Sequence, residues 1–285
     1  MVACHVSADQ LDHLFVGVAC RDIPALARNL LGHDGSFVEG EGWDYVGARL
    51  VPVKIQLCGR LAVVIDGTRV EERLPERQGR LLFVYLTLNR LRPVTRDELA
   101  EAVWPDGRDG GLAPLLSKLR RVVPVEGTRL AVPAESWVDV EAAADAAHRA
   151  ESAVAQGQFA RAWGPAQVAL FTASRPLLPG QDAPWLDEER RRLAELRLRA
   201  LEAYGAATLG LGGTELTAAV RVGRRLTADE PYRESGWRIL IQALAAEGNL
   251  AEALQAYERL RVLLREELGI APSAATQDLH RVLLG

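Results

Sequence analysis

Residues 77–105 read "RQGRLLFVYLTLNRLRPVTRDELAEAVWP" and contain two helical patterns separated by a short turn. In the first pattern, apolar residues recur at helical spacing and share one face, at Leu81, Leu82, Tyr85 and Leu88. The second pattern begins at Thr95, which stands three residues before Glu98, the spacing of a capping box. Pro105 ends this pattern, because proline cannot continue a helix. The stretch therefore predicts two consecutive helices.

Short β-rich runs flank this stretch, and a third amphipathic helix follows it. Apolar and polar residues alternate in "VKIQLCG" (53–59) and "RLAVVIDG" (60–67), which predicts two strands that form a hairpin sheet. The segment "GLAPLLSKLRR" (111–121) has the period of a helix. Two further β runs, "TRLAV" (128–132) and "SWVDV" (136–140), are separated by a proline-containing turn and predict a second hairpin. The predicted order is strands, three helices and a hairpin.

From residue 141 onward the pattern is almost wholly helical, with short glycine or proline turns between Ala-, Leu-, Glu- and Arg-rich segments. Gly157, Gly213 and Gly248 each precede an alanine by five residues, at a turn that a helix follows. The last two glycines are 35 residues apart, close to the roughly 34-residue period of tetratricopeptide helical hairpins. Residues 141–285 therefore predict an irregular array of helical hairpins, a type of fold that more often binds proteins than catalyses reactions.

The composition fits a globular protein without a strongly basic character. Of 285 residues, 48% are hydrophobic and 25% charged, and the net charge is −4. By segment the formal charge is −4 for residues 1–50, +2 for residues 51–140 and −2 for residues 141–285. Any contact with nucleic acid must therefore come from a local patch, and the middle segment is the basic one.

The cysteines and apolar runs point to a cytoplasmic protein. The three cysteines are odd in number and widely spaced, which is typical of a reducing compartment rather than of a disulfide framework. No apolar run reaches the length needed to span a membrane, and we expect no membrane association. Potential metal ligands gather near the start, at Cys4, His5, His13, Cys20 and His33. They lack the closely spaced pairs of structural zinc sites, so neither a metal nor another cofactor is expected.

The helix predicted at residues 111–121 has one apolar and one polar side. The apolar side is formed by Leu112, Leu115, Leu116, Leu119 and Val123. The other side carries Pro114, Ser117, Lys118 and Arg121, with Arg120 on the flank. Proline is tolerated in the first turn of a helix and costs about 3 kcal/mol or more in its interior, so this helix is predicted to start at Leu112 or Ala113. Taken alone, the cationic side is more typical of a solvated surface than of a DNA contact.

A resemblance to a known family rests on several dense motifs. Residues 231–273 contain Pro231, Arg233-Glu234, Gly248, Glu252-Ala253-Leu254, Tyr257 and the closing "EELGIAPS". This block resembles the bacterial transcriptional activator domain, and residues 183–204 resemble the long arginine-rich helix that precedes it. Upstream, residues 78–105 and "LLSKLRR" (115–121) are similar to the winged helix-turn-helix of antibiotic-regulatory-protein (SARP) activators. The resemblance covers residues 53–285 and leaves the first fifty unexplained.

The resemblance implies a sequence-specific, DNA-binding activator of transcription. Such proteins bind repeated promoter sites in the major groove of double-stranded DNA, commonly as side-by-side dimers, and recruit RNA polymerase. The expected fold is mostly α with a small β part, and three regions are predicted. Residues 1–51 form an extension of unknown structure, residues 52–140 a winged helix-turn-helix domain, and residues 141–285 an all-α, tetratricopeptide-like activator domain. Such a protein is cytoplasmic, and associated with the nucleoid when bound to DNA.

Two groups of residues are the candidates for DNA contact. In the third predicted helix they are Ser117, Lys118, Arg120 and Arg121, which carry the side-chain chemistry that reads base edges or binds phosphates. Around it, phosphate contacts are expected from Thr95, Arg96 and Arg80, and contact with the minor groove from Arg129 in the second hairpin. Trp104 occupies the family's tryptophan position at the end of the second helix. Each of the second group has an ordinary alternative: a helix cap at Thr95 and Arg96, core packing for Trp104, and plain surface charges for Arg129 and Arg80.

A second function class stays open. The weak basic balance and Pro114 also fit a helical-repeat interaction scaffold whose winged helix does not bind DNA on its own. No nucleophile elbow or zinc-protease motif is present in the sequence, and the glycines of "GLGG" (210–213) follow a helix rather than a strand. We therefore expect no enzymatic activity.

Overall fold

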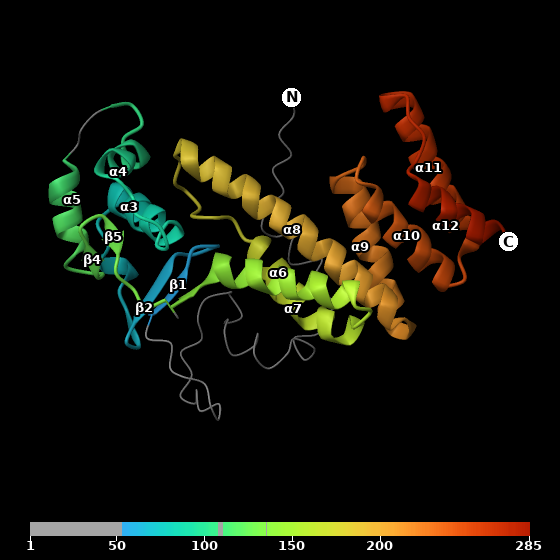
Figure 1. Cartoon of the computed structure of the whole chain (residues 1–285), viewed down its shortest axis with the longest axis horizontal. Helices are drawn as coiled ribbons and strands as arrows, with labels where there is room; N and C mark the ends of the chain where they lie inside the picture. The colour runs from blue at the N-terminus through green and yellow to red at the C-terminus, as the bar shows by residue number, and fades with distance from the viewer. Residues whose placement is uncertain (1–52, 108–110, 135) are drawn as a thin grey trace. The chain divides into compact units, whose positions relative to one another are not determined.

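The computed structural model describes residues 53–107, 111–134 and 136–285 (Figure 1). The predicted extension and its cysteine and histidine group lie outside these residues. In the first part of the described chain the elements are β1 (Val53–Gln56), β2 (Ala62–Ile65), β3 (Thr68–Arg69), the 3-10 turn η1 (Glu71–Arg73), α3 (Arg77–Leu88), α4 (Arg96–Val103), α5 (Leu112–Leu119), β4 (Val125–Glu126), β5 (Arg129–Leu130) and β6 (Trp137–Val138).

The rest of the described chain is helical. Its elements are α6 (Asp139–Ala155), α7 (Phe159–Ala173), α8 (Pro184–Leu211), the 3-10 turn η2 (Gly213–Glu215), α9 (Leu216–Asp229), α10 (Glu234–Ala246), α11 (Leu250–Leu268) and α12 (Ala274–Leu284). The predicted fold class is confirmed: a small winged helix-turn-helix with a minor β part precedes an all-α array of helical hairpins.

One pairing differs from the prediction. The runs 128–132 and 136–140 do not form a hairpin with each other, because β6 pairs in parallel with β1, at Lys54 with Trp137 and Ile55 with Val138. This completes a sheet of order β3-β2-β1-β6, in which β1 and β2 are antiparallel as expected. A parallel pair needs a long crossover, and the helices between β1 and β6 supply it.

The hairpin that does form is one strand earlier. β4 pairs with β5, at Val125 with Leu130 and Glu126 with Arg129. Between them lies the two-residue turn Gly127-Thr128, in which Gly127 has a φ of +58°. Tight hairpin turns need such positive φ values, which glycine adopts without strain. This hairpin is the wing of the winged helix.

The start signals of α4 and α5 are confirmed. The Thr95 hydroxyl accepts a hydrogen bond from the amide of Glu98, and the Glu98 carboxylate accepts one from the amide of Thr95, which completes the capping box. Helix α5 begins at Leu112, after Gly111 with a φ of +90°. Pro114 therefore lies in the first turn, where its missing N–H breaks no hydrogen bond of the helix.

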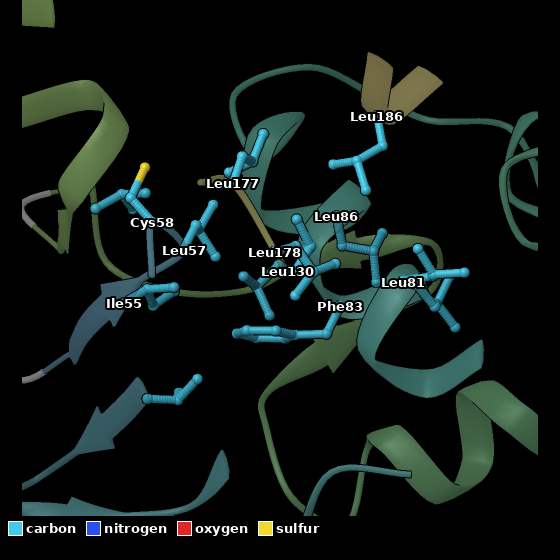
Figure 2. Packing of buried hydrophobic residues seen from close by; sticks show 14 of the residues in the cluster. Ile55, Leu57, Cys58, Leu81, Phe83, Leu86, Leu130, Leu177, Leu178 and Leu186 are labelled. Carbon is cyan, nitrogen blue, oxygen red and sulfur yellow. The ribbon is translucent and has the colours of Figure 1, made fainter. Parts of the chain in front are cut away.

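A single core joins the winged helix to the first helices of the array. Phe83, at 0% exposure, lies in α3 among side chains from the sheet and the wing, such as Ile55 and Leu130. Leu177 and Leu178, from the segment that leads into α8, belong to the same cluster (Figure 2). Burial of large aliphatic and aromatic side chains is the main favourable term in folding, so these two parts of the chain stabilise each other.

The array confirms the glycine turns expected from the sequence. Gly157, Gly213 and Gly248 have φ values of +68°, +55° and +85° and stand in the turns between helices. Close packing between helices uses small residues as well. A Cβ atom on Gly223 of α9 would lie 2.7 Å from the Cα atom of Leu240 in α10. Any side chain at this position would push the two helices apart.

The described residues contain neither a membrane-spanning helix nor a cluster of potential metal ligands. No helix in this part of the chain is long and apolar enough to cross a membrane. Within the same residues, no group of three or more His, Cys, Asp or Glu side chains is placed to hold a metal ion. Cys58 is buried there as a free thiol, and burial raises its pKa far above the ordinary value.

A buried carboxylate links the sheet to the start of the array. Asp139, the first residue of α6, is 2% exposed. Its Oδ2 atom accepts hydrogen bonds from the amides of Leu57 (2.9 Å) and Cys58 (2.8 Å), and its Oδ1 atom accepts one from Val140. Next to it, the amide of Leu178 donates to the carbonyl oxygen of Leu57 at 3.1 Å. The end of β1 is thus bonded to two segments of the array.

This carboxylate makes stability depend on pH. Burial raises the pKa of Asp139 to about 6, despite its N–H donors. The folded state therefore holds a proton between about pH 4 and pH 6 that the unfolded chain has released. As the pH rises through this window, the free energy of unfolding should fall by about 3 kcal/mol relative to the Asp139→Asn variant. Urea denaturation of both proteins at several pH values measures this difference. If the difference stayed constant across the window, the three N–H donors would be keeping Asp139 ionised.

Candidate nucleic-acid interface

The two faces of α5 are separated as the sequence predicts. Its inner side chains, Leu112, Leu116 and Leu119, are at most 6% exposed and pack in the core. On the other face the side chains of Ser117 and Lys118 are exposed, as is that of Arg121 in the turn after α5, and none of the three side chains makes a hydrogen bond or ion pair with any described residue. The helix and the turn that follows it thus present one hydroxyl and two cationic side chains that are not engaged within the described part of the protein.

Arg120 differs from its neighbours because it holds the wing. Its Nε atom donates to the carbonyl oxygen of Val125 at 3.3 Å, and its Nη2 atom donates to that of Gly127 at 2.7 Å. The guanidinium therefore satisfies carbonyl groups of β4 and of the turn. The sequence did not indicate this role, because the acceptors are backbone atoms of a turn that was not predicted.

The wing is also attached to the turn between α3 and α4. The Thr128 hydroxyl donates to the carbonyl oxygen of Val94 at 2.5 Å, and Arg129 Nε donates to that of Arg90 at 3.3 Å. Arg129 is nevertheless exposed, so its remaining N–H groups face solvent. These bonds set the position of the wing beside α5 (Figure 1).

The start of α4 has mixed electrostatics. Thr95 is engaged in its capping box, and the exposed Arg96 follows it. The helix dipole and the remaining free amides favour an anion here. However, Asp97 and Glu98 place two carboxylates in the same turn, and the hydrogen bond from the Thr95 amide holds the pKa of Glu98 below its ordinary value. Of the groups here, Arg96 is the one suited to a phosphate.

The remaining two predicted residues lie in different settings. Trp104 is half-buried at the end of α4 and packs against the core, which accounts for its position without a ligand. Arg80 is exposed in the first turns of α3. Neither makes a hydrogen bond or ion pair with another described side chain, and their contact with DNA stays a prediction.

A hollow beside α5 adds a cation that the sequence did not single out. It has a volume of about 530 Å³ and lies between η1, the start of α3 and the outer face of α5. Its lining includes Arg73, Gly79, Leu115, Lys118 and Arg121. Arg73 belongs to a short 3-10 turn with no periodic pattern, so only the three-dimensional arrangement brings it close to the cations of α5.

Comparison with protein families and relatives gives consistent matches. The family model described as "Bacterial transcriptional activator domain" matches residues 138–284, more than half of the chain. The transcriptional regulatory protein EmbR of Mycobacterium tuberculosis (strain H37Rv) is 28% identical over 246 residues, which cover 80% of this chain and 62% of EmbR. The regulatory protein AfsR of Streptomyces coelicolor is 33% identical over 223 residues, which cover 73% of this chain and 22% of AfsR.

A solved structure is similar as well. It is described as Mycobacterium tuberculosis EmbR in complex with a low-affinity phosphopeptide, and it superposes with a TM-score of 0.70 at 26% identity. The match covers 82% of this chain and 65% of that chain. This chain therefore spans about three fifths of the length of EmbR and about a fifth of AfsR.

The two neighbouring arginines that follow α5 should affect stability differently. Arg120→Ala removes the donors to Val125 and Gly127, and we expect the free energy of unfolding to fall by about 1 kcal/mol. Arg121→Ala removes a solvated side chain and should change it by less than about 0.5 kcal/mol. Urea denaturation of the two variants beside the wild type measures both values. Equal losses would show that the bonds of Arg120 to the wing do not contribute to stability.

Proposed function

Because this chain belongs to the bacterial transcriptional activator domain family, as a SARP-type member, we propose that it regulates transcription by binding promoter DNA through α5 and its wing. The observation that carries the proposal is the outer face of α5. Its apolar side is fixed in the core, and the exposed side chains of Lys118 in α5 and Arg121 in the turn after it have no partner in the described part of the protein. A helix of this kind fits the major groove, where such side chains bond to base edges or phosphates. We propose no enzymatic activity, since the relatives are regulators by name.

In this proposal, only a few side chains read the base sequence of the DNA. Arg121, Lys118 and Ser117 contact base edges, with Arg121 suited to bond guanine through two N–H groups. Arg120 supports the wing instead, because its guanidinium is committed to backbone carbonyls. The first turn, with Pro114, offers no side-chain donor. One copy thus reads a short sequence, and we propose that two copies bind repeated promoter sites side by side.

Phosphate contacts surround this reading helix and set its orientation on the duplex. Arg96 at the start of α4, Arg129 in the wing and Arg80 in α3 are the exposed cations placed for them. Arg73 joins this group because it shares a hollow with Lys118 and Arg121. Thr95 contributes by fixing the first turn of α4, and Trp104 by fixing its end.

The helical array would supply the activating surface. Arrays of helical hairpins present extended surfaces to protein partners, and we propose that this one holds RNA polymerase at the promoter. The alternative is an interaction scaffold whose winged helix does not bind DNA on its own. It draws support from the two carboxylates at the start of α4 and the small positive charge of residues 51–140. Measurements of DNA binding decide between the two.

DNA binding should weaken with salt in a defined way. When a protein neutralises phosphates, the logarithm of the binding constant falls linearly with the logarithm of salt concentration, by about 0.9 per phosphate for duplex DNA. Fluorescence anisotropy of a labelled random duplex, measured over a salt series, gives this slope. We expect a slope that corresponds to several phosphates. Absence of binding at the lowest salt would favour the scaffold.

Two arginine variants should separate the roles assigned here. Arg121→Ala should weaken binding to a duplex selected by the wild type by about 1–3 kcal/mol and leave binding to a random duplex nearly unchanged. Arg96→Ala should weaken both equally and reduce the salt slope by about 1. Arg259→Ala, an exposed cation of α11, is the matched control and should change neither. Equal losses on both duplexes for Arg121→Ala would contradict its role in base reading.

A further inference from the structure

Two attachments outside the sheet hold the winged helix on the array. One is made by the residue Arg90, just after the end of α3, and the other by the last turn of α4. Together we call these two attachments the joint, which is formed by Tyr85, Arg90, Ala102, Glu141 and Trp185. Each pairs a residue of the winged helix with the first turn of an array helix, α6 or α8. Because they lie at separate points, they resist rotation in a way that a single attachment could not.

The first attachment is a bidentate ion pair. Arg90 Nε and Nη2 donate to the two carboxylate oxygens of Glu141 at 2.9 and 2.7 Å, and its Nη atoms also approach the carbonyl oxygens of Pro133 and Ala134. The side chain of Arg90 is 6% exposed. Parallel N–H···O bonds between planar groups fix orientation as well as distance. The backbone oxygen of Arg90 accepts the bond from Arg129 in the wing, so the same residue touches both wing and array.

The second attachment is made by Trp185, the second residue of α8. Its indole N–H donates to the carbonyl oxygen of Ala102 at 2.9 Å. This oxygen lies in the last turn of α4, where helical carbonyls have no partner within the helix. The indole ring also meets Tyr85 of α3 edge to face, with ring centroids 5.2 Å apart. One side chain thus contacts both helices that support α5.

Helix α8 turns a small change at the joint into a large displacement. It runs from Pro184 to Leu211 (Figure 1), which corresponds to a length of about 42 Å at the usual rise per residue. A rotation of about 10° at Trp185 would move its other end by about 7 Å. Helices α9 and α10 pack on α8 and would move with it.

We propose that Arg90 and Trp185 are positioning residues, which fix the direction in which the array leaves bound DNA. The inference rests on the proposed function, since it concerns how DNA binding is converted into activation. A rigid joint makes activation depend on which side of the duplex the protein occupies relative to the promoter. A loose joint lets the array reach polymerase from several sides and lowers the fraction of molecules oriented for contact.

The experiment uses the full chain with a double variant, Glu141→Gln with Trp185→Phe. It keeps Arg90 and the aromatic packing but removes one charge and the indole N–H. The matched control is Glu151→Gln with Trp237→Phe. Glu151 forms the same bidentate pair with Arg199, and the Trp237 indole donates to the carbonyl oxygen of Pro231, both within the array.

A duplex selected from a random pool by the wild type is placed upstream of a weak promoter, directly or with insertions of 5 or 10 base pairs. Anisotropy gives DNA affinity, and transcription with purified bacterial RNA polymerase gives activation. For the wild type and the control, an insertion of about half a helical turn should abolish activation and one of a full turn should restore it. The joint variant should bind DNA as the wild type does, lose about fivefold in activation without an insertion, and depend less on the insertion.

The outcomes separate the two proposals. If the wild type does not bind DNA, the proposed function fails and this inference with it. If it binds and activates, but the joint variant shows the same yield and the same dependence on the insertion, the positioning role is wrong while the proposed function stands. A loss of DNA affinity in the joint variant would also contradict the role, because it would place the joint in binding rather than in orientation.

Discussion

The burial of α3 is the constraint on which the other elements depend. Leu82, Phe83 and Val84 are consecutive and all at 0% exposure, so beyond its exposed first turn this helix has apolar groups on more than one side that must be covered. The sheet, α5 and the wing cover part of it. The remainder is covered by Leu177 and Leu178, which belong to the array. A winged helix built around such a helix cannot complete its core without the activator domain.

Local signals in the sequence were sufficient for much of the fold. The capping box at Thr95, the start of α5 before Pro114 and the turns at Gly157 and Gly248 each depend on residues close in sequence, and all are confirmed. The second hairpin was wrong for the opposite reason. The partner of β6 is β1, about eighty residues earlier, and no local pattern reports that distance. The apolar period of α3 was also an incomplete guide, since it predicted one apolar face, whereas the structure buries residues on more than one side of the helix after its first turn.

In the candidate site, too, features set by local sequence were predictable and features set by contacts between distant residues were not. Helical phase correctly separated the leucines of α5 from Ser117, Lys118 and Arg121, because the two faces of one helix follow from its own sequence. The phase could not tell Arg120 from Arg121, since the carbonyl acceptors of Arg120 come from a turn further along the chain. Arg73 was missed because tertiary structure alone brings η1 beside α5. Whether a surface arginine is bonded within the protein or available to a ligand therefore depends on tertiary neighbours that helical periodicity does not reveal.

Pro114 has a consequence for the thermodynamics of association. A helix start without a side-chain cap leaves its first N–H groups unpaired and tends to fray, and a binding partner must then order it at an entropic cost. Here the fixed φ of Pro114, three residues after the left-handed Gly111, holds the first turn of α5 in place before any ligand arrives. This turn contributes no side-chain recognition, but it lowers the entropy lost on binding. What α5 lacks in the number of base contacts it recovers partly as preorganisation.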